Sequence, residues 1–391
     1  MNILFFIHRY PNYGGTEKVT TVLCNELQKK GNNVFLVSLY QKSWELMDEL
    51  SPNVSFTPLH YPTINFDNIR RLHKIIVDNK IEVVINQWCL PLTTTILLKC
   101  ALFGTTAKLI SVLHGSPNVN MRLISVARKA NTANAIKRSF LSILWKLVYL
   151  VTRIDLRIVY RLSDKYILLS DRFADVFKKM AWLRSSTKLT SITNPITINV
   201  TKEDLAFVSD KKKKILYVGR MDLLNKNVDR IIKAWGKICN AYTDWVLVLV
   251  GDGPDKPYLE TLAAKLSIKN IKFTGFIKEE PVAYYKESSI LMLASDLEGF
   301  GLVITEAMYF GCIPVVYGSY PAIYDIISDG ECGFITPQPY NENYTCEKLA
   351  TLIENQQLRR IMSKKAIEKA VTFLPEQVIK KWEDLFNAIL V

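Results

Sequence analysis

Two glutamates, Glu298 and Glu306, stand eight positions apart in the last third of the chain, and a Gly-Phe-Gly segment follows the first of them. A hydrophobic run precedes Glu298, and the residues from Leu302 onward read as a helix. Glycine has no Cβ, so the backbone of this loop can approach a ligand closely. The free amides and the dipole of a helix N-terminus favour a phosphate. Two nearby carboxylates could hold hydroxyl groups on either side of that phosphate, which is the chemistry of a nucleotide sugar: a diphosphate between a ribose and a hexose.

Two basic residues lie in a loop earlier in the same half of the chain. Arg220 directly follows a predicted strand over Lys214–Gly219, and Lys226 directly precedes a predicted helix over Asn227–Asn240. Charge-assisted hydrogen bonds from such a pair can neutralise the two phosphates of a departing diphosphate. This arrangement needs no metal ion.

Two further loops carry candidate ligand contacts. Phe276 and Ile277 follow a predicted strand over Ile271–Thr274, where a nucleotide base could stack on the aromatic ring. Core packing explains Phe276 equally well. His114 ends a predicted strand over Lys108–His114 and could hydrogen-bond a hexose hydroxyl or ease proton movement. The alternative for His114 is a purely structural histidine.

A pair of glycines follows the first predicted strand. Gly14 and Gly15 precede a predicted helix over Thr16–Lys30, so a phosphate or a sugar could approach the backbone there. The alternative is a tight turn with Thr16 as the helix cap. The chain contains neither G-x-G-x-x-G nor G-x-x-x-x-G-K-[ST], which argues against nicotinamide dehydrogenases and P-loop enzymes.

Two α/β domains are needed to position these loops. Runs of Val, Ile and Leu alternate with helical patterns, which predicts parallel sheets covered by helices on both faces. The 391 residues exceed one ordinary core, so we expect an N-terminal domain over 1–200 and a C-terminal domain over 201–391, joined in the polar stretch Asn199–Lys213. The last helix could pack back on the N-terminal domain. Two such Rossmann-like domains facing one another would leave a ligand cleft at their strand ends.

The pattern of each half predicts the individual elements. Strands are expected at Asn2–His8, Asn33–Leu39, Val54–Thr57, Glu82–Gln87, Lys108–His114, Lys165–Ser170, Lys188–Thr193, Lys214–Gly219, Trp245–Gly251, Ile271–Thr274, Ile290–Ala294, Ile313–Tyr317 and Gly333–Thr336. Helices are expected at Thr16–Lys30, Asp67–Asn79, Pro91–Phe103, in the region 121–160, at Arg172–Ala181, Asn227–Asn240, Lys256–Leu266, Glu280–Lys286, Leu302–Phe310 and in two segments after Asn343.

Positive charge is concentrated in the N-terminal half. The net charge is +13; residues 1–200 carry 26 Lys and Arg against 12 Asp and Glu, and the remainder carries 24 against 25. Residues 122–161 hold nine basic side chains and one acid, interleaved with Phe, Leu, Ile and Trp. This pattern is typical of a helix on an anionic membrane surface, and its apolar stretch is too short to span a bilayer. The alternatives are a core helix with a solvated basic face and, more weakly, nucleic-acid binding, which no recognised motif supports.

The cysteines indicate the compartment. All seven stand singly, without a C-x-x-C pair, which favours a reducing compartment and argues against a disulfide or zinc framework. The first residues lack the basic segment and the small-residue cleavage site of a signal peptide, and read as a strand. We therefore expect a cytoplasmic protein, peripheral on the inner face of the cell membrane.

Taken in order, these motifs resemble the retaining glycosyltransferases of family 4, in the two-domain GT-B superfamily. The resemblance covers almost the whole chain and rests on Gly14-Gly15-Thr16-Glu17, His114-Gly115, Gly219-Arg220, Lys226-Asn227-Val228-Asp229, Gly251-Asp252-Gly253 and the E-x7-E pair. The first of these segments and the stretch Pro321–Gly333 look most like bacterial polysaccharide and glycan-assembly members. In one departure, Gly318-Ser319 and then Asp325 stand where many relatives have a second glycine and a glutamate.

The resemblance implies a role for each charged position. Arg220 and Lys226 would hold the diphosphate, Glu298 would face the donor sugar as a positioning residue, and Glu306 would bind the ribose hydroxyls. Front-face attack at the anomeric carbon would retain its configuration through an oxocarbenium-like state. The leaving phosphate oxygen would assist deprotonation of the acceptor.

Other matching positions imply further donor contacts. The amides of Phe300, Gly301 and Leu302 would approach the hydroxyls or the phosphate of the donor. Gly15 would lie near the phosphate and His114 near the hexose. The donor would be a hexose or N-acetylhexosamine linked to a nucleotide, expected to be UDP, and the acceptor would be lipid-linked or a polysaccharide. No cofactor and no metal would be required.

Two other functions fit the same residues. One is a nucleotide-sugar epimerase, or a soluble sugar-phosphate transferase, of the same fold. The other is a non-catalytic subunit that binds a sugar nucleotide and recruits partners to a membrane. The presence of both glutamates together with Arg220 and Lys226 favours an enzyme.

Overall fold

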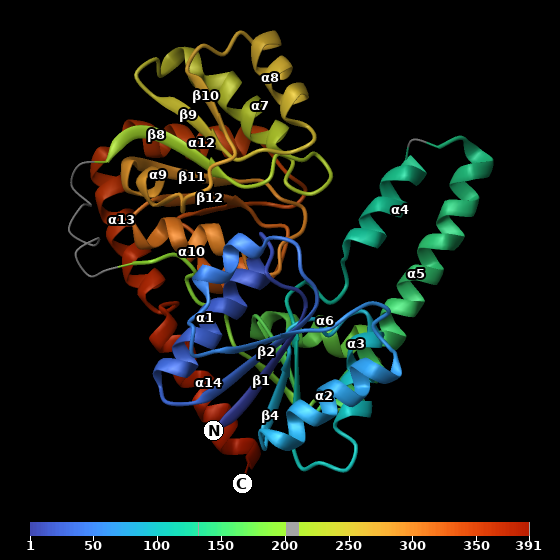
Figure 1. Cartoon of the computed structure of the whole chain (residues 1–391). Helices are drawn as coiled ribbons and strands as arrows, with labels where there is room; N and C mark the ends of the chain where they lie inside the picture. The colour runs from blue at the N-terminus through green and yellow to red at the C-terminus, as the bar shows by residue number, and fades with distance from the viewer. Residues whose placement is uncertain (132, 201–210, 391) are drawn as a thin grey trace. The chain divides into compact units, whose positions relative to one another are not determined.

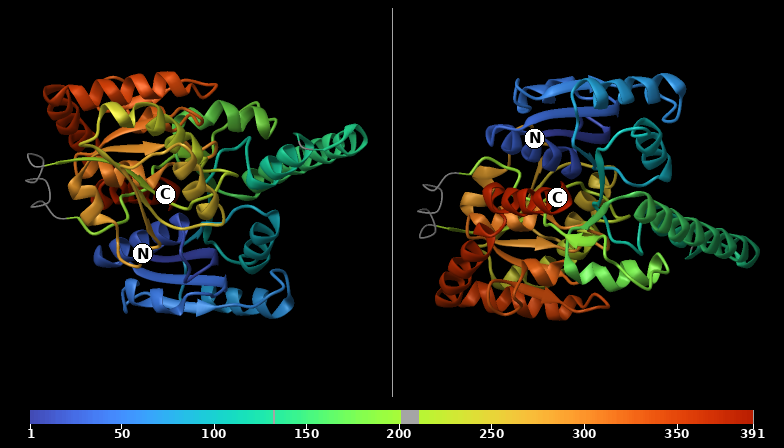
Figure 2. Two further views of the ribbon diagram at one scale, coloured as in Figure 1. Left: turned by 90° about the horizontal axis from the view of Figure 1, so that it is seen from above. Right: turned by 90° about the horizontal axis from the view of Figure 1, so that it is seen from below.

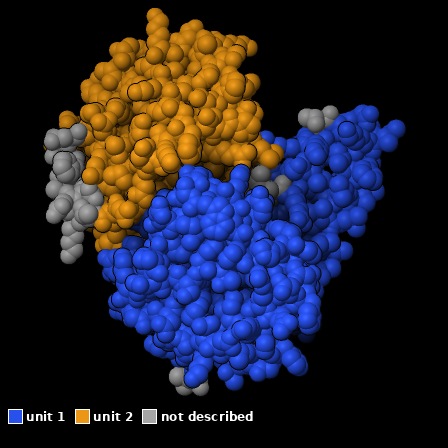
Figure 3. Space-filling model, viewed as in Figure 1, with its two compact units in different colours: residues 1–197, 375–391 blue, residues 198–374 orange. Residues whose placement is uncertain are grey.

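The chain forms two compact units, which Figure 3 distinguishes by colour. The computed structural model describes residues 1–131, 133–200 and 211–390. Unit 1 comprises Met1–Thr197 and Pro375–Val391, and unit 2 comprises Ile198–Leu374. The chain therefore leaves unit 1, completes unit 2 and returns to unit 1 for its last helix. Most of the predicted join, Asn199–Lys213, lies outside the described residues.

Unit 1 is built on a seven-stranded parallel sheet in the order β3-β2-β1-β4-β5-β6-β7. Its strands are β1 (Asn2–Arg9), β2 (Asn33–Tyr40), β3 (Ser55–Pro58), β4 (Val83–Asn86), β5 (Lys108–Leu113), β6 (Lys165–Leu168) and β7 (Leu189–Ser191). Its helices are α1 (Gly15–Lys29), α2 (Phe66–Asp78), α3 (Leu92–Ala101), α4 (Met121–Asn131), α5 (Ala135–Leu162), α6 (Ala174–Met180) and α14 (Pro375–Leu390), with short 3-10 helices η1 (Trp44–Glu49) and η2 (Asp171–Phe173).

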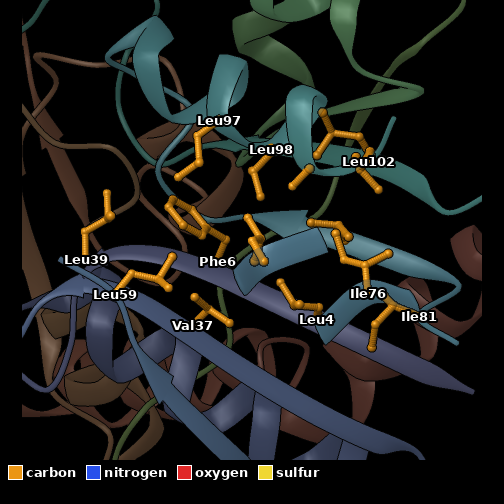
Figure 4. Close-up of a cluster of buried hydrophobic side chains, with 14 residues drawn as sticks. Leu4, Phe6, Val37, Leu39, Leu59, Ile76, Ile81, Leu97, Leu98 and Leu102 are labelled. Carbon is orange, nitrogen blue, oxygen red and sulfur yellow. The ribbon is translucent and has the colours of Figure 1, made fainter. Parts of the chain in front are cut away.

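Both faces of the unit 1 sheet are buried, as its unbroken apolar strands predict. Successive residues of β1 point to opposite faces, and Ile3 through Ile7 are all fully buried. On one face, Leu4 and Phe6 pack with side chains of β2, α2 and α3 in the cluster of Figure 4. Burying each such side chain contributes roughly 1.5–3 kcal/mol. This packing fixes the strands, and therefore fixes the loops that leave their carboxyl ends.

Unit 2 repeats the scheme with a six-stranded parallel sheet in the order β10-β9-β8-β11-β12-β13. Its strands are β8 (Lys212–Val218), β9 (Val246–Val250), β10 (Ile271–Gly275), β11 (Ser288–Leu293), β12 (Ile313–Tyr317) and β13 (Phe334–Thr336). Its helices are α7 (Val228–Ile238), α8 (Lys256–Lys265), α9 (Val282–Glu287), α10 (Leu302–Tyr309), α11 (Ile323–Ile326), α12 (Glu342–Glu354) and α13 (Gln356–Val371), with a 3-10 turn η4 (Cys239–Ala241). The predicted fold class, two Rossmann-like α/β domains with parallel sheets, is confirmed.

The prediction of two helices after Asn343 was wrong, because three occur, α12, α13 and α14. The side chain of Asn355 accepts a hydrogen bond from the amide of Leu358, so Asn355 ends one helix and caps the next. Pro375 then opens the third helix, where its missing amide hydrogen costs nothing.

The predicted helical region 121–160 is a hairpin of two helices, α4 and α5. Asn134 caps α5 by accepting a hydrogen bond from the amide of Lys137. In Figure 1 and Figure 2 the two helices lie side by side and extend beyond the sheet of unit 1. Within the described residues, no helix is both long enough and apolar enough to cross a membrane.

Candidate functional site

The candidate site residues of unit 2 gather where two neighbouring strands end. β8 and β11 lie side by side and parallel, so the loops after Val218 and Leu293 leave the same edge of the sheet. In these loops the Nζ of Lys226 lies 2.5 Å from the Oε1 of Glu298. Their side chains are only 22% and 14% exposed. The structure thus brings together two of the predicted charged residues, which are 72 positions apart in the sequence.

The Lys226 loop is held by polar groups of its own and of the neighbouring loop. The Oδ1 of Asp222 accepts hydrogen bonds from the amides of Asn225 (2.7 Å) and Lys226 (3.2 Å). The side-chain oxygen of Asn225 accepts from the amide of Leu297 (2.9 Å), and its carbonyl accepts from the amide of Asp296 (2.8 Å). Asn225 therefore joins the two loops and sets the position of Lys226 relative to Glu298.

Arg220 belongs to the same loop, and its side chain extends into solvent. Its side chain is 69% exposed, and its Nε lies 3.8 Å from the Oδ2 of Asp222. Its carbonyl accepts a hydrogen bond from the hydroxyl of Tyr217 (2.8 Å), which fixes the backbone there. An exposed guanidinium and a half-buried ammonium thus come from one loop, an arrangement that can bind an anion through several donors.

The Gly-Phe-Gly segment brings the backbone close to the start of α10. Gly301 has φ +91, and a Cβ on it would lie 2.6 Å from the hydroxyl of Tyr320. That hydroxyl donates to the carbonyl of Phe300 (3.1 Å). The ring of Phe300 is buried against Phe373, so only the backbone of Phe300, and not its side chain, could contact a ligand. The amides of Leu302 and Val303, the first two of α10, have no acceptor within the helix, whereas that of Ile304 donates to the carbonyl of Gly301 (2.9 Å).

Glu306 points into the interior of unit 2. It is 5% exposed, and its Oε2 accepts a hydrogen bond from the hydroxyl of Tyr285 (3.1 Å). Burial, with Glu306 beside it, raises the pKa of Tyr285 well above its usual value. Glu298 and Glu306 therefore have different settings: one is paired with a cation at the sheet edge, and the other is held by a tyrosine inside. The role of Glu306 at a ribose stays a prediction.

Phe276 and Ile277 follow β10 at the carboxyl edge of the same sheet. Phe276 is 60% exposed, which rules out the core-packing alternative. Stacking of a nucleotide base on its ring stays a prediction.

Gly15 begins α1 at the carboxyl edge of the unit 1 sheet, and it is exposed. The helix cap is Gly14, which makes no side-chain cap bond, so the alternative that Thr16 caps the helix was wrong. A Cβ on Gly14 would lie 2.3 Å from the carboxylate of Glu17. That carboxylate is buried, which raises its pKa, and it accepts a hydrogen bond from the side-chain amide of Asn12 (3.0 Å).

His114 follows β5 at the same edge of unit 1, and its ring is half-buried. Its Nε2 forms a hydrogen bond with the Oε1 of Gln87. Burial lowers the pKa of His114 to about 4, so the ring is neutral at physiological pH.

Several residues that shape the unit 2 site were not predicted from the sequence. The Nη1 of Arg230 lies 2.6 Å from the Oδ1 of Asp296 and 3.1 Å from the carbonyl of Ala294. The Arg230 guanidinium also lies 5.2 Å and 5.1 Å from the ring centroids of Tyr317 and Tyr340. A polar residue just after a strand, such as Asp296, is a weak signal of this role, and its partner is visible only in the fold.

The unit 2 site has the chemical groups that a phosphorylated sugar needs. It combines an exposed guanidinium, an ammonium paired with a carboxylate and a helix N-terminus preceded by glycine. In the part of the chain that the structure describes, no three His, Cys, Asp or Glu residues group to hold a metal ion.

Known proteins resemble the chain along its length. Residues 13–199 match the sequence model of Glycosyltransferase Family 4, and residues 201–369 match that of Glycosyl transferases group 1. An uncharacterized glycosyltransferase of Haemophilus influenzae is 27% identical over 97% of this chain and 98% of its own. The N-acetyl-alpha-D-glucosaminyl L-malate synthase of Bacillus anthracis is 22% identical over 100% of this chain and 98% of its own.

One relative that matches a shorter part of the chain, and one solved structure, also resemble this protein. An N-acetylgalactosaminyltransferase of Campylobacter jejuni, named for a diphospho-undecaprenol acceptor, is 30% identical over 45% of this chain and 47% of its own. Anabaena HepE, solved in complex with UDP and glucose, has a TM-score of 0.73 at 15% identity, over 99% of this chain and 100% of its own. This likeness shows a shared fold.

Proposed function

Because the chain belongs to the family 4 glycosyltransferases of the GT-B fold, which act on nucleotide sugars, we propose that its donor is a UDP-linked hexose or N-acetylhexosamine. The proposed acceptor is lipid-linked or a polysaccharide, and the proposed outcome is retention at the anomeric carbon. The UDP complex of Anabaena HepE supports the donor, and the undecaprenol acceptor of the Campylobacter relative supports the acceptor.

One observation carries the proposal: Lys226 and Glu298 are paired beside the Gly301 turn at the carboxyl edge of the unit 2 sheet. An ammonium has three donors, so Lys226 can bind a phosphate oxygen while it still faces Glu298. Arg220 would add a second cation to the diphosphate. Neutralising the charge that develops on the leaving group is worth about 3–4 kcal/mol per well-placed donor in other enzymes.

The proposed step balances without a cofactor or a metal. The bond between the anomeric carbon and the phosphate oxygen breaks, and its electron pair stays on UDP. The acceptor oxygen bonds to the same face of that carbon, and its proton passes to the departing phosphate. Glu298 would stabilise the oxocarbenium-like carbon by its charge and would position the sugar.

The test is UDP release by the purified full chain. A thermal-shift screen with UDP-glucose, UDP-N-acetylglucosamine, UDP-N-acetylgalactosamine and GDP-mannose comes first, because a ligand that prefers the folded state raises the unfolding midpoint. Turnover is then measured with undecaprenyl-diphosphate-linked sugars and, because of the Bacillus relative, with L-malate. We expect UDP-sugar turnover that EDTA does not inhibit, an α-linked product by NMR and no turnover by Glu298→Ala. An inverted product, full activity of that variant or epimerised free donor would refute the proposal.

We also propose that the α4–α5 hairpin binds an anionic membrane surface, which would place the protein on the cytoplasmic face of the cell membrane. The hairpin exposes seven large apolar side chains on α5, between 41% and 86% exposed. Six of them follow one another at alternating steps of four and three residues, which places them along one face of the helix. The seven are Ile136, Phe140, Ile143, Leu147, Leu150, Val151 and Ile154.

Charge beside this apolar face favours a lipid surface over a second protein. Lys137 and Lys146 are exposed on α5, about 80–100° on either side of the apolar face at the helical period. Other basic residues of the region have structural partners: Arg153 donates to the carbonyls of Lys179 and Met180. Apolar side chains flanked by lysines suit acyl chains below anionic headgroups.

Vesicle binding tests the membrane proposal. Phe140 and Leu147 are each more than half exposed, so changing both to Ser should cost about 3 kcal/mol of membrane binding, roughly a hundredfold. Phe103→Ser, at an 84% exposed position outside the hairpin, should leave binding unchanged. Binding to phosphatidylglycerol vesicles should also fall with salt and in the double variant Lys137→Gln/Lys146→Gln. Unchanged vesicle binding by Phe140→Ser/Leu147→Ser, with loss of self-association in sedimentation, would instead indicate a protein interface.

A further inference from the structure

Gln87 holds His114 from the neighbouring strand of unit 1. β4 and β5 pair in parallel, and both residues follow the carboxyl ends of these strands. The amide of Gln87 donates to the carbonyl of Phe6 (2.9 Å), and the residue is 1% exposed. Its backbone is therefore anchored in the sheet, and the Oε1 of its side chain contacts the Nε2 of His114.

This contact defines which ring nitrogen of His114 carries the hydrogen. The structure turns the oxygen of the Gln87 amide towards the ring; an amide oxygen only accepts hydrogen bonds, so in this orientation the Nε2 of the ring is the donor. In a neutral ring the other nitrogen, Nδ1, then has a lone pair and no hydrogen. Without Gln87 the two tautomers would be free to exchange.

The Nδ1 of His114 is left without a protein partner. It is buried, and among the described residues it has no hydrogen-bond partner. The Nε2 of Gln87 is also buried and also lacks a hydrogen-bond partner among these residues. A buried polar atom without a partner is destabilising, because it has lost its hydrogen bonds to water. The two nitrogens of an imidazole ring point away from one another, so Nδ1 faces away from Gln87. Because the atom is buried, a substrate reaches it only where the surrounding side chains move aside.

We propose that Gln87 is a positioning residue that fixes the Nε2–H tautomer of His114, so that Nδ1 accepts a hydrogen bond from a substrate hydroxyl. A hydroxyl has a hydrogen to donate, whereas an ionised phosphate or carboxylate oxygen has none. The pair thus selects a neutral, hydroxyl-bearing part of a substrate over an anionic part. This inference rests on the proposed function, and neither the sequence motifs nor the relatives assign a role to Gln87.

The tautomer is measured directly in the free protein. The chain has four histidines, so two-bond ¹H–¹⁵N spectra of protein labelled with ¹⁵N-histidine are simple, and His114→Gln assigns the signal. We expect a single Nε2–H tautomer for His114, and a mixture of tautomers in Gln87→Met, which keeps the side-chain volume but removes the acceptor. Gln87→Leu serves in the same way if the Met variant does not fold. An unchanged single tautomer in either variant would overturn the inference.

A double-mutant cycle then tests whether Gln87 acts through His114. We expect Gln87→Met to raise the KM of the UDP-sugar selected in the thermal-shift screen up to about tenfold, which is the worth of one hydrogen bond, with a smaller change in kcat. In the His114→Gln background the same change should have no further effect. Additive effects, or a KM unchanged in Gln87→Met, would mean that the Nδ1 only holds a water molecule. Absence of all turnover by the wild type would refute the proposed function itself, whatever the tautomer.

Discussion

Removal of Lys226 offers the sharpest test of the unit 2 site. Lys226→Met takes away the ammonium 2.5 Å from the Oε1 of Glu298 and leaves that carboxylate, 14% exposed, without its cation. The backbone of the loop should hold, because Asp222 and Asn225 fix it through main-chain amides. The change therefore acts on the ion pair rather than on the shape of the loop.

The expected loss of stability follows from the burial of the pair. Breaking a fully buried pair costs about 3–5 kcal/mol, whereas exposed pairs contribute about 0–1 kcal/mol. Lys226 and Glu298 lie between these limits, so each single variant, Lys226→Met or Glu298→Gln, should cost about 2 kcal/mol, or about 4–8 °C in the unfolding midpoint. The double variant no longer leaves a charge unpaired, and we expect it to be more stable than the sum of the two losses predicts.

Turnover separates a catalytic pair from a structural one. If Lys226 and Glu298 act on the diphosphate and the sugar, both single variants and the double variant should be slower by a factor on the order of 100 or more. Thermal unfolding by circular dichroism and UDP release are measured on the same preparations. A double variant that regains both stability and wild-type turnover would refute the site assignment. A Lys226→Met protein with an unchanged midpoint would refute the structural coupling.

Two further predictions concern unit 2. Gly301→Ala should lower the free energy of unfolding by about 2 kcal/mol, because the new Cβ meets both an unfavourable φ and a steric clash. Gly330→Ala, at φ +76 with open space around its Cβ, should lower it by about 1 kcal/mol. Equal losses in thermal unfolding would contradict the clash. Hydrogen bonds from Lys212 and Lys214 lower the pKa of Glu287 from 4.5 to about 2, so their stabilising effect is complete above pH 4.5 and is lost as the pH falls towards 2. The midpoint of Glu287→Gln should therefore lie below that of the wild type at pH 7 and meet it near pH 2, and a gap independent of pH would contradict this.

The strands were predictable because strands buried on both faces appear in the sequence as unbroken apolar runs. β1 and β9 are buried on both faces and read as Val, Ile, Leu and Phe without alternation, so period and length identify them. The carboxyl ends of β8 and β11, which read in the same way, then located Arg220, Lys226 and Glu298 in loops at one sheet edge. Helix ends were less predictable, since Asn355 both ends α12 and caps α13, a role its sequence context does not reveal.

Pairings between loops were not predictable. The hydrogen bonds of Asn225 to the Glu298 loop, and the contact of Gln87 with His114, join residues far apart in the chain. They depend on strand order, which the sequence pattern does not specify. The apolar spacing of α5 raised a similar problem, because residues such as Phe140 at helical intervals read equally well as core, and only the hairpin shows them to be exposed.

The return of the chain to unit 1 affects how the protein is made. α14 packs on α1 and buries Val378, Trp382 and Phe386, yet these residues are synthesised after all of unit 2. Domains generally fold as units during synthesis, the N-terminal part first. Here the first unit to begin folding is completed after the second, and the surface of α1 stays uncovered until α14 leaves the ribosome. A chain truncated before Pro375 would keep the whole of unit 2 and yet expose an apolar surface on unit 1, so loss of the last 17 residues should promote aggregation.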